Sequence, residues 1–432
     1  YKRYDEDLPT RQLPRELPTT TASTVAVLAG TAQIEPGTLD LPQVSRLLHL
    51  SAGVVRTMVR PYATWLFRAA GSAGGRFPLE LYVAVPEGHE LPPGVHWYQP
   101  EAHALVRVAP PPTDGVPTVV VTGIPWRTGW RYRERGYRHI YWDAGTMLSQ
   151  LLGVAASAGI EASLFTRFPD ADVASLVGAD GIHEWPIAVV ALGGDVPAIR
   201  ATGPAAAGRV DAAPVEFPLE TAAQRAGDVE ELGSPWERPH PVETPIVGGP
   251  PIDEVALSRG SVRLLDATKS VSLDMFRTSL LAATRGVPVS HVVAVHAVDG
   301  MAPGIYGWPE DAPRRGGDMR GELYRLALEQ DLAKDAAFVT IATANVGALD
   351  DRGYREAQLG AGIVEGRLHL LAYALGAAAS GMTFADSELE AVVGEQVDGL
   401  LLTCVGVPEY TSVGGGAPGV PNEVRQITPR SS

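Results

Sequence analysis

Runs of apolar residues divide the first part of the chain into strands and one long helix. LELYVAV at 79–85 is nearly all apolar, and VPTVVVTG at 116–123 is rich in β-branched residues. Such runs predict strands that are buried on both faces. Apolar residues at helical spacing from 138 to 158, followed by Gly159, predict a long helix with a glycine C-cap. IAVVALG at 187–193 is the last expected strand of this half.

The same succession of patterns begins again in the second half of the chain. The sequence RGYR at 135–138 recurs at 352–355, and each copy is followed by an Ala-Gly pair. The proline before the strand at 79–85 has a counterpart in Pro288, which is followed by VSHVVAV. Two equivalent α+β units in one chain, related by a two-fold pseudo-symmetry, are the simplest interpretation.

Composition divides the rest of the chain into connecting segments. Residues 1–23 are charged and rich in Pro and Thr, which is typical of an arm rather than of a folded element. Ala, Pro, Gly and Glu dominate the stretch after residue 200, which indicates a linker or a wrapping extension. The expected organisation is an arm at 1–37, a first domain at 38–200, an extension at 201–250, a second domain at 251–419 and a tail at 420–432.

The two halves differ at two places, and the differences are complementary. The first half has a turn of small residues, Gly71–Gly75, where backbone N–H groups have room to approach a flat ligand. The second half lacks this turn but carries Arg259, Ser261 and Arg263 at alternate positions, a donor set that suits a phosphate. Each half therefore holds half of one candidate site. The alternatives are an ordinary turn before a strand and a solvated basic loop.

Composition and charge exclude several classes of partner and site. The 432 residues include 35 basic and 50 acidic side chains, and a net charge of −15 argues against nucleic acid or an anionic membrane as the main partner. No apolar run is long enough to span a bilayer. The single cysteine, Cys404, is compatible with a reducing cytoplasm, where we expect the protein. The ten histidines lack ligand spacing, so no metal site is predicted.

The segment RAAGSAG at 68–74, followed by FPLELYV at 77–83, resembles the nitroreductase superfamily of flavoproteins, and within it the SagB or thiazole/oxazole dehydrogenase type. The resemblance covers roughly 38–200 and 253–410. It implies a three-layer α+β fold, FMN as cofactor and one intact site from two fused domains that form a pseudo-dimer. By this resemblance the FMN-binding residues are Arg68, Ser72, Ala73 and Gly74 in the first half, and Arg259, Ser261, Arg263, Met382, Thr383 and Arg425 in the second. Gly71 and Gly260 depart from the family pattern of Pro and Arg.

The segment WRYRERGYR at 130–138 is similar to a second motif of this type, W-K-Y-G-E-R-x-Y-R, whose Lys-Tyr pair is associated with azoline dehydrogenation. Arg131 replaces the lysine and stays protonated, so it does not act as a base. Tyr132 is the expected proton relay, with Arg131 lowering the pKa of its phenol. The structural alternative is that the arginines of this segment pair with Glu134 and Asp143.

The resemblance implies an FMN-dependent oxidoreductase that dehydrogenates an azoline or a similar C–N or C–S bond in a peptide natural product, with O2 reoxidising the flavin. The expected partners are a peptide or small-molecule substrate and other biosynthetic enzymes, and the expected state is a monomeric pseudo-dimer or a homodimer. An NAD(P)H-dependent nitro or quinone reductase is the first alternative. A flavin-less binding partner in a peptide-modifying complex is the second.

Overall fold

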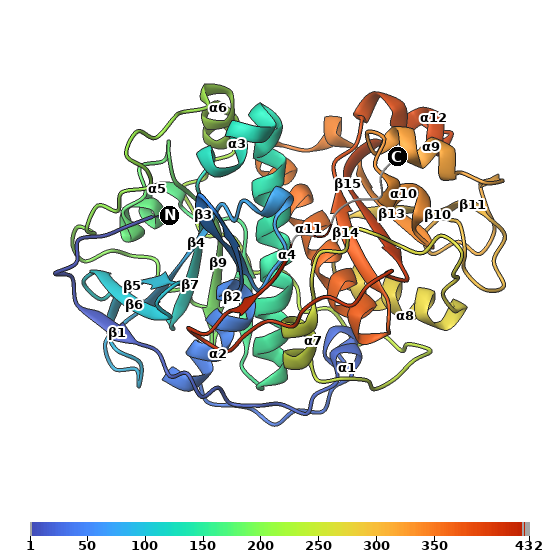
Figure 1. The fold of residues 1–432 in the computed structure, drawn as a ribbon. Coiled ribbons are helices and arrows are strands. Elements are labelled where there is room, and N and C mark those ends of the chain that lie inside the picture. Colours follow the sequence, from blue (N-terminus) through green and yellow to red (C-terminus); the bar gives the residue numbers. More distant parts are fainter. Residues whose placement is uncertain (1, 426, 428–432) are drawn as a thin grey trace.

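Two long helices lie side by side at the centre of the molecule, and a large sheet lies on each side of the pair (Figure 1). The helices are α4 (Gly136–Ser157) and α11 (Asp351–Ala374). The structure is a computed structural model that describes residues 2–425 and 427. The helix expected at 138–158 is thus confirmed, and Gly159, with φ +67°, follows its end.

The first sheet has seven antiparallel strands in the order β1-β6-β5-β4-β7-β9-β8. They are β1 (Thr10–Gln12), β4 (Leu79–Val85), β5 (Gly94–Gln99), β6 (Ala104–Ala109), β7 (Thr118–Gly123), β8 (Ala162–Phe165) and β9 (Trp185–Leu192). The three apolar runs of this half form β4, β7 and β9, and every residue in them is buried. Their prediction as fully buried strands is confirmed, because helices cover one face of the sheet and loops with α5 (Asp170–Val177) cover the other.

The second sheet repeats the order of the first without its edge strand. Its six strands run β12-β11-β10-β13-β15-β14. They are β10 (Ser290–Val295), β11 (Gly304–Gly307), β12 (Arg315–Gly316), β13 (Phe338–Ala344), β14 (Ala378–Met382) and β15 (Asp398–Gly406). Along the chain, α4 lies between β7 and the edge strand β8 of the first sheet. In the same way, α11 lies between β13 and the edge strand β14 of the second sheet. The mixed α/β architecture with two similar domains agrees with the expected fold class.

Glycines bring the two central helices into direct contact. A Cβ atom on Gly145 of α4 would lie 2.3 Å from the carbonyl oxygen of Leu359, and one on Gly362 of α11 would lie 2.4 Å from that of Trp142. No side chain tolerates such distances, so each helix needs glycine at the crossing. These two glycines belong to the Ala-Gly pairs that recur in the sequence. The repeated motif therefore marks the contact between the two halves.

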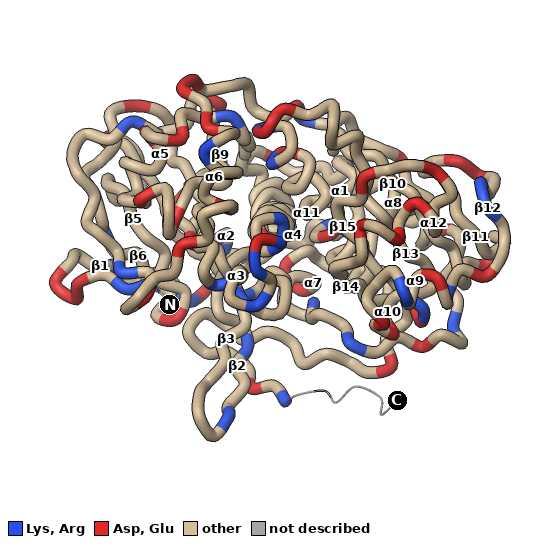
Figure 2. The backbone as a smooth tube through the Cα atoms, turned by 90° about the horizontal axis from the view of Figure 1, so that it is seen from above, with Lys and Arg blue, Asp and Glu red and all other residues tan. Residues whose placement is uncertain are grey.

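A third, small sheet has the order β16-β2-β3. Strands β2 (Val54–Arg60) and β3 (Ala63–Arg68) form a hairpin that projects from the body of the molecule (Figure 2). Strand β16 (Asn422–Glu423) of the tail pairs in parallel with β2. In the second half, α8 leads into β10 without a hairpin, so this element distinguishes the first half.

Shorter helices cover the sheets and connect them. They are α1 (Thr24–Ala29), α2 (Leu41–Ala52), α3 (Trp126–Tyr132), α5 (Asp170–Val177), α6 (Pro218–Ala226), α7 (Ile252–Ser258), α8 (Leu273–Thr284), α9 (Arg320–Leu326), α10 (Asp331–Asp335) and α12 (Leu389–Val393), with 3-10 turns at Ala73–Gly75, Arg133–Arg135, Val346–Ala348 and Asp386–Glu388. Within the extension at 201–250, α6 is the one regular helix. No helix among the described residues has the length and apolarity needed to cross a membrane.

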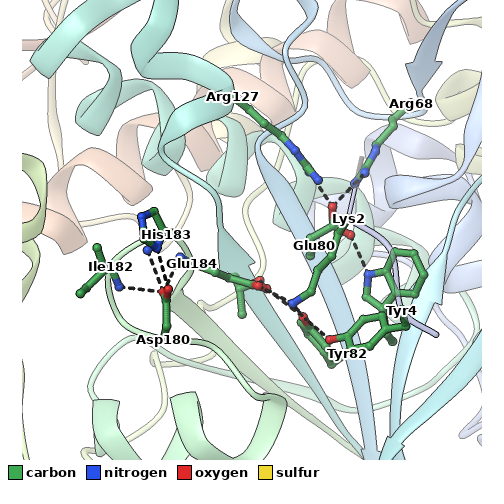
Figure 3. Close-up of polar contacts among 12 residues, drawn as sticks. Lys2, Tyr4, Arg68, Glu80, Tyr82, Arg127, Asp180, Ile182, His183 and Glu184 are labelled. Carbon is green, nitrogen blue, oxygen red and sulfur yellow. Dashed lines mark hydrogen bonds and ion pairs between the residues drawn. The ribbon is translucent and has the colours of Figure 1, made fainter. Parts of the chain in front are cut away.

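The N-terminal segment is more firmly folded than its composition predicts. Residues 10–12 form β1 at the edge of the first sheet, and Lys2 is fully buried. Its ammonium group forms an ion pair with Glu184 and donates a hydrogen bond to the hydroxyl of Tyr82 at 2.6 Å (Figure 3). The expectation of an arm without folded elements is wrong here. Strand pairing and a buried ion pair depend on distant residues, which local composition does not report.

Candidate functional site

The glycine-rich turn of the first half meets the Arg-Gly-Ser-Val-Arg segment of the second half. Arg259 caps the end of α7, and its Nη2 donates a hydrogen bond to the carbonyl oxygen of Ala69 at 2.5 Å. A Cβ atom on Gly71 would lie 3.4 Å from Nη1 of the same guanidinium. The two half-sites expected from the sequence are therefore adjacent.

Two buried arginines make this junction electrically positive. Arg56 on β2 donates to the carbonyl oxygens of Leu257 at 2.6 Å and of Arg259 at 2.9 Å. Burial and the neighbouring charge of Arg56 lower the pKa of Arg259 to about 10, and Glu365 offsets the shift only in part. Nε of Arg259 is buried and has no hydrogen-bond partner among the described residues. A bound anion would compensate two cations that now contact mainly carbonyl groups.

The other two residues of the predicted phosphate set lie at the surface. Ser261 and Arg263 are exposed, whereas Val262 between them is buried, as expected for an extended segment with alternating faces. The backbone N–H of Arg263 donates to the hydroxyl of Tyr410 at 3.0 Å. The structure thus leaves the Ser261 hydroxyl and the Arg263 guanidinium open to solvent close to the buried Arg259.

Asp143 of α4 holds the glycine-rich turn in place. Its carboxyl group accepts hydrogen bonds from the hydroxyl of Ser72 and from the backbone N–H of Ala73, the latter at 2.8 Å. The Ser72 hydroxyl in turn accepts from the N–H of Phe77 at 2.8 Å. Burial raises the pKa of Asp143 from 3.8 to about 8. The suggested pairing of Asp143 with nearby arginines is wrong, because the turn occupies both of its oxygens.

Tyr132 lies against the same turn. A Cβ atom on Gly74, which has φ +60°, would be 2.5 Å from the Tyr132 hydroxyl. The Arg131 guanidinium lies 5.7 Å from the centre of the Tyr132 ring. Burial raises the pKa of Tyr132, and the charge of Arg131 opposes this shift without reversing it. Arg131 therefore acts on this pKa in the expected direction, but desolvation of the half-buried phenol outweighs the cation and the net shift is upward.

A buried carboxylate couples the turn to the helix that carries Tyr132. Glu80 on β4 forms an ion pair with Arg127 of α3 at 2.5 Å and lies 3.7 Å from Arg68 at the start of the turn (Figure 3). Arg68 also donates to the carbonyl oxygen of Leu79 at 2.6 Å. Burial opposes ionisation of Glu80, but the two guanidiniums bring its pKa below the usual range. This interior position gives Arg68 a visible structural role.

Arg135 joins the WRYRERGYR segment to the second half. Its guanidinium donates to the hydroxyl of Thr383 at 2.9 Å and to the carbonyl oxygen of Phe384 at 2.8 Å, and it pairs with Asp386. Met382, the neighbour of Thr383, is buried in the core of the second half. Of these two residues expected near the flavin, Thr383 contacts the first half directly, whereas Met382 packs within the second.

Sequence reasoning missed a polar pair on α11. His369 lies 3.3 Å from Nη1 of Arg259 through its Nδ1 and 3.5 Å from Glu365 through its Nε2. Glu365 accepts a hydrogen bond from Thr146 of α4 at 3.2 Å. Burial lowers the pKa of His369, although Glu365 opposes the shift. The signal in the sequence was a glutamate and a histidine one helical turn apart, so that both lie on the same face of the helix.

The space beside the glycine-rich turn is small. A cavity of about 20 Å³ lies between the turn and α4, lined by Ser72, Asp143 and Met147 among others. It has room for about one water molecule.

Arg425 follows β16, is exposed, and has no hydrogen bond or ion pair with the other candidate residues in the described part of the chain. Among residues 2–425 and 427, no three His, Cys, Asp or Glu side chains are grouped to hold a metal ion.

Comparison with known proteins gives the fold a family context. Residues 40–194 match the Nitroreductase family. A candidate nitroreductase of Methanocaldococcus jannaschii is 25% identical over 170 residues, which are 36% of this chain and 81% of that protein. The crystal structure of a candidate nitroreductase from Anabaena variabilis aligns with a TM-score of 0.73 and 23% identity over 94% of this chain and 96% of that one. The fold is therefore nitroreductase-like over nearly the whole length.

A chain of the E. coli microcin synthetase McbBCD complex, solved with truncated pro-MccB17 bound, also aligns with part of the molecule. The alignment covers 38% of this chain and 70% of that one at 20% identity, with a TM-score of 0.32. A likeness at this level carries no argument about substrate or partners.

Proposed function

We propose that this protein is an FMN-dependent oxidoreductase of the SagB type, which dehydrogenates an azoline or a similar C–N or C–S bond in a peptide. The observation that supports it most is the meeting of the two half-sites. Arg259 of the second half lies under the turn that contains Ser72 of the first, with a buried Nε that lacks a partner among the described residues. A phosphate suits such an uncompensated guanidinium.

The residues present fit a flavin phosphate and a ring close to backbone. Arg259, Ser261 and Arg263 would hold the phosphate, with the positive charge of Arg56 behind them. Gly74 leaves backbone exposed where a Cβ atom would lie 2.5 Å from the Tyr132 hydroxyl, and a Cβ atom on Gly71 would only reach van der Waals contact with Arg259. Both halves of the site come from one chain through the contact of α4 with α11, so a pseudo-dimer would complete the site without a second copy.

FMN, when bound, would supply the hydride chemistry, with O2 as the final oxidant. The task of the protein is then to bind, orient and move a proton. Tyr132 is the proposed relay, because its hydroxyl is fixed against the turn at Gly74 and its raised pKa keeps it neutral. Arg131 stays protonated, so its role is to orient the phenol and the substrate by charge.

The flavin content of the purified protein tests this proposal. After reconstitution with FMN and removal of the excess, acid release should give close to one FMN per chain. A ratio close to two would contradict the single-site proposal. A colourless protein that retains no FMN would favour the flavin-less binding partner instead.

The match of residues 40–194 to the Nitroreductase family favours a second candidate, an NAD(P)H-dependent reductase of nitro or quinone compounds. Stopped-flow mixing of the flavoprotein with NAD(P)H separates the two. Rapid bleaching of the flavin would favour the reductase. Slow bleaching with NAD(P)H, together with reduction by an azoline peptide under anaerobic conditions, would favour the dehydrogenase.

A further inference from the structure

Strand β3 has an open edge that faces away from the rest of its sheet. Its partner β2 is occupied on its far side by β16, where the backbone N–H of Val424 donates to the carbonyl oxygen of Thr57 at 2.7 Å. Thr57 lies opposite Leu66 in the hairpin register. Because hydrogen-bonding direction alternates along a strand, Leu66 and Thr64 direct their N–H and C=O groups outward on the other edge. No strand among the described residues pairs there.

The β3 edge lacks the features that normally protect an open strand. Residues 63–66, ATWL, contain no charge and no proline. Trp65 is 41% exposed, and Tyr62 at the hairpin turn is 78% exposed. An extended segment added to this edge would find free backbone donors and acceptors and an apolar surface for alternate side chains.

The surroundings of this edge are basic although the protein is acidic. Arg60 and Arg76 of residues 41–79 are only partly buried, Arg131 and Arg133 of residues 115–133 are exposed, and neither stretch has an Asp or Glu. Figure 2 shows basic positions at the hairpin and around the neighbouring α3. At the base of the hairpin, Arg76 lies 4.4 Å above the ring of the exposed Trp130, and the charge of Arg131 adds to the burial that lowers the pKa of Arg76.

The base of β3 leads into the candidate site. The rings of Phe67 and Phe77 are in edge-to-face contact at 6.3 Å, and a Cβ atom on Gly75 would lie 3.7 Å from Phe67. Arg68 then begins the segment that contains the turn at 71–75. A chain that follows β3 from its tip to its base would therefore arrive at the turn and at Tyr132.

We infer that the outer edge of β3 is a docking strand for an extended, acidic peptide segment, which binds by strand addition and is thereby delivered to the glycine-rich turn. The hairpin already accepts one extended segment, since β16 pairs on the opposite edge. A second copy of this chain fits less well, because pairing two β3 edges would bring Arg60 and Arg76 of each copy toward those of the other. The assignment of the bound peptide as substrate rests on the proposed function, whereas binding itself does not need turnover.

Fluorescence anisotropy with the full-length protein tests the docking strand. The probe is a labelled twelve-residue peptide in which Glu alternates with Val and Thr, compared with the same peptide carrying Lys for Glu. The acidic peptide should bind, and its affinity should fall as salt rises. The Lys peptide should bind about tenfold more weakly or not at all.

Matched variants separate backbone pairing from charge. Thr64→Pro removes an outward N–H without touching the bonds to β2 and should weaken binding by about tenfold, the effect of one or two lost hydrogen bonds. Thr64→Val keeps the N–H and should bind like the wild type. Arg60→Glu should weaken binding by about three- to tenfold, whereas Arg325→Glu on the exposed face of α9 should not.

Three results would overturn the inference. The first is equal binding of the acidic and Lys peptides. The second is unchanged binding by Thr64→Pro in a protein whose circular dichroism matches the wild type. The third is a concentration-dependent dimer that Thr64→Pro abolishes, which would assign the edge to a second copy. Peptide binding by a protein that takes up no FMN would refute the proposed function and leave the docking strand intact. The reverse pattern would refute the docking strand alone.

Discussion

Replacing Asp143 by asparagine should remove a loss of stability that the wild type shows as the pH rises toward about 8. Asp143 accepts from Ser72 and from the N–H of Ala73 inside the junction of the two halves. Burial raises its pKa to about 8, so the folded protein retains this proton after the unfolded chain has released it. A carboxyl group with a raised pKa favours folding at low pH, and this contribution is lost as the pH rises to the folded-state pKa.

The size of the effect follows from the linkage between protonation and folding. Between the ordinary pKa of 3.8 and about 8, the wild type should lose about 1.4 kcal/mol of unfolding free energy per pH unit from this one group. Over pH 6.5 to 8 the loss amounts to about 2 kcal/mol, which corresponds to roughly 4–8 °C in Tm for a domain of about 200 residues. Asparagine has the shape of the neutral acid and does not titrate, so it lacks this slope.

Differential scanning calorimetry of both proteins from pH 6 to 9 measures the difference. The Tm of the wild type should fall relative to that of Asp143→Asn as the pH rises, and the two curves should run parallel beyond about pH 8.5. Other titrating groups, such as Glu220 with its pKa raised to about 8 by burial, are present in both proteins and cancel in the difference. Asp143→Ala is the control, with a pH dependence like that of asparagine but a lower Tm throughout. Parallel curves of wild type and Asp143→Asn from pH 6 to 9 would refute the assignment of a protonated Asp143.

Four further outcomes are expected. Arg263→Ala should weaken FMN binding by one to two decades, the loss of a charge-assisted hydrogen bond of about 1.5–3 kcal/mol, while Arg325→Ala leaves it unchanged; full flavin occupancy after dialysis of the first variant would contradict the phosphate site. Tyr132→Phe should keep FMN and lose about 10²–10⁴-fold in turnover, with Arg131→Lys retaining activity, and wild-type turnover by the phenylalanine variant would make the segment structural. Glu80→Gln should cost about 3–5 kcal/mol, because Arg68 and Arg127 would face a neutral amide in the interior, and a Tm within about 2 °C of the wild type would contradict this. Burial lowers the pKa values of five histidines to about 4: His49, His96, His103, His291 and His296. Their contribution to stability is therefore present above about pH 6.5 and is lost as the pH falls toward 4. A Tm that stays level from pH 7 to 4.5 would contradict these shifts.

The elements that periodicity predicts are those whose burial is uniform. LELYVAV and the long helix around Gly145 were visible in the sequence because each is surrounded by apolar partners along its whole length. The β2–β3 hairpin was not predicted, since its tip is solvated and its apolar residues do not alternate cleanly. The burial of Lys2 was equally hidden, because it depends on Glu184, which is far away in the sequence.

The candidate site could be predicted only in part, because only some of its residues form a pattern within a single segment. Residues at fixed short spacing, such as Arg259, Ser261 and Arg263, form a pattern that a single segment displays. Asp143 carries no such pattern, because its partners come from the turn at 71–75. Glu365 could be recognised only by its spacing to His369 on the same helix, and its contact with Thr146 of α4 needed the fold. The direction of the Tyr132 pKa shift also needed the fold, since burial and charge act on it in opposite directions.

The pseudo-symmetric counterpart of the site supports a single centre per chain. When RGYR at 352–355 is placed on RGYR at 135–138, Glu365 and His369 correspond to Leu148 and Leu152. The polar pair that contacts Arg259 on one side is thus replaced by two leucines in the first half, and Leu148 is fully buried there.

The connecting segment closes that second position. Arg285 donates hydrogen bonds to the carbonyl oxygens of Leu28 and Pro239, at 2.9 and 2.8 Å, and so ties the end of α8 to α1 and to the extension. The half-buried Arg367 of α11 donates to the carbonyl oxygens of Ala283 and Arg285. Arg285 and Arg367 donate hydrogen bonds to backbone carbonyl oxygens, some of them at the ends of helices, which need such donors. Arg259 differs, because its buried Nε has no partner among the described residues. The same residue type therefore has a structural role on one side of the molecule and, in the proposed function, binds the anion on the other.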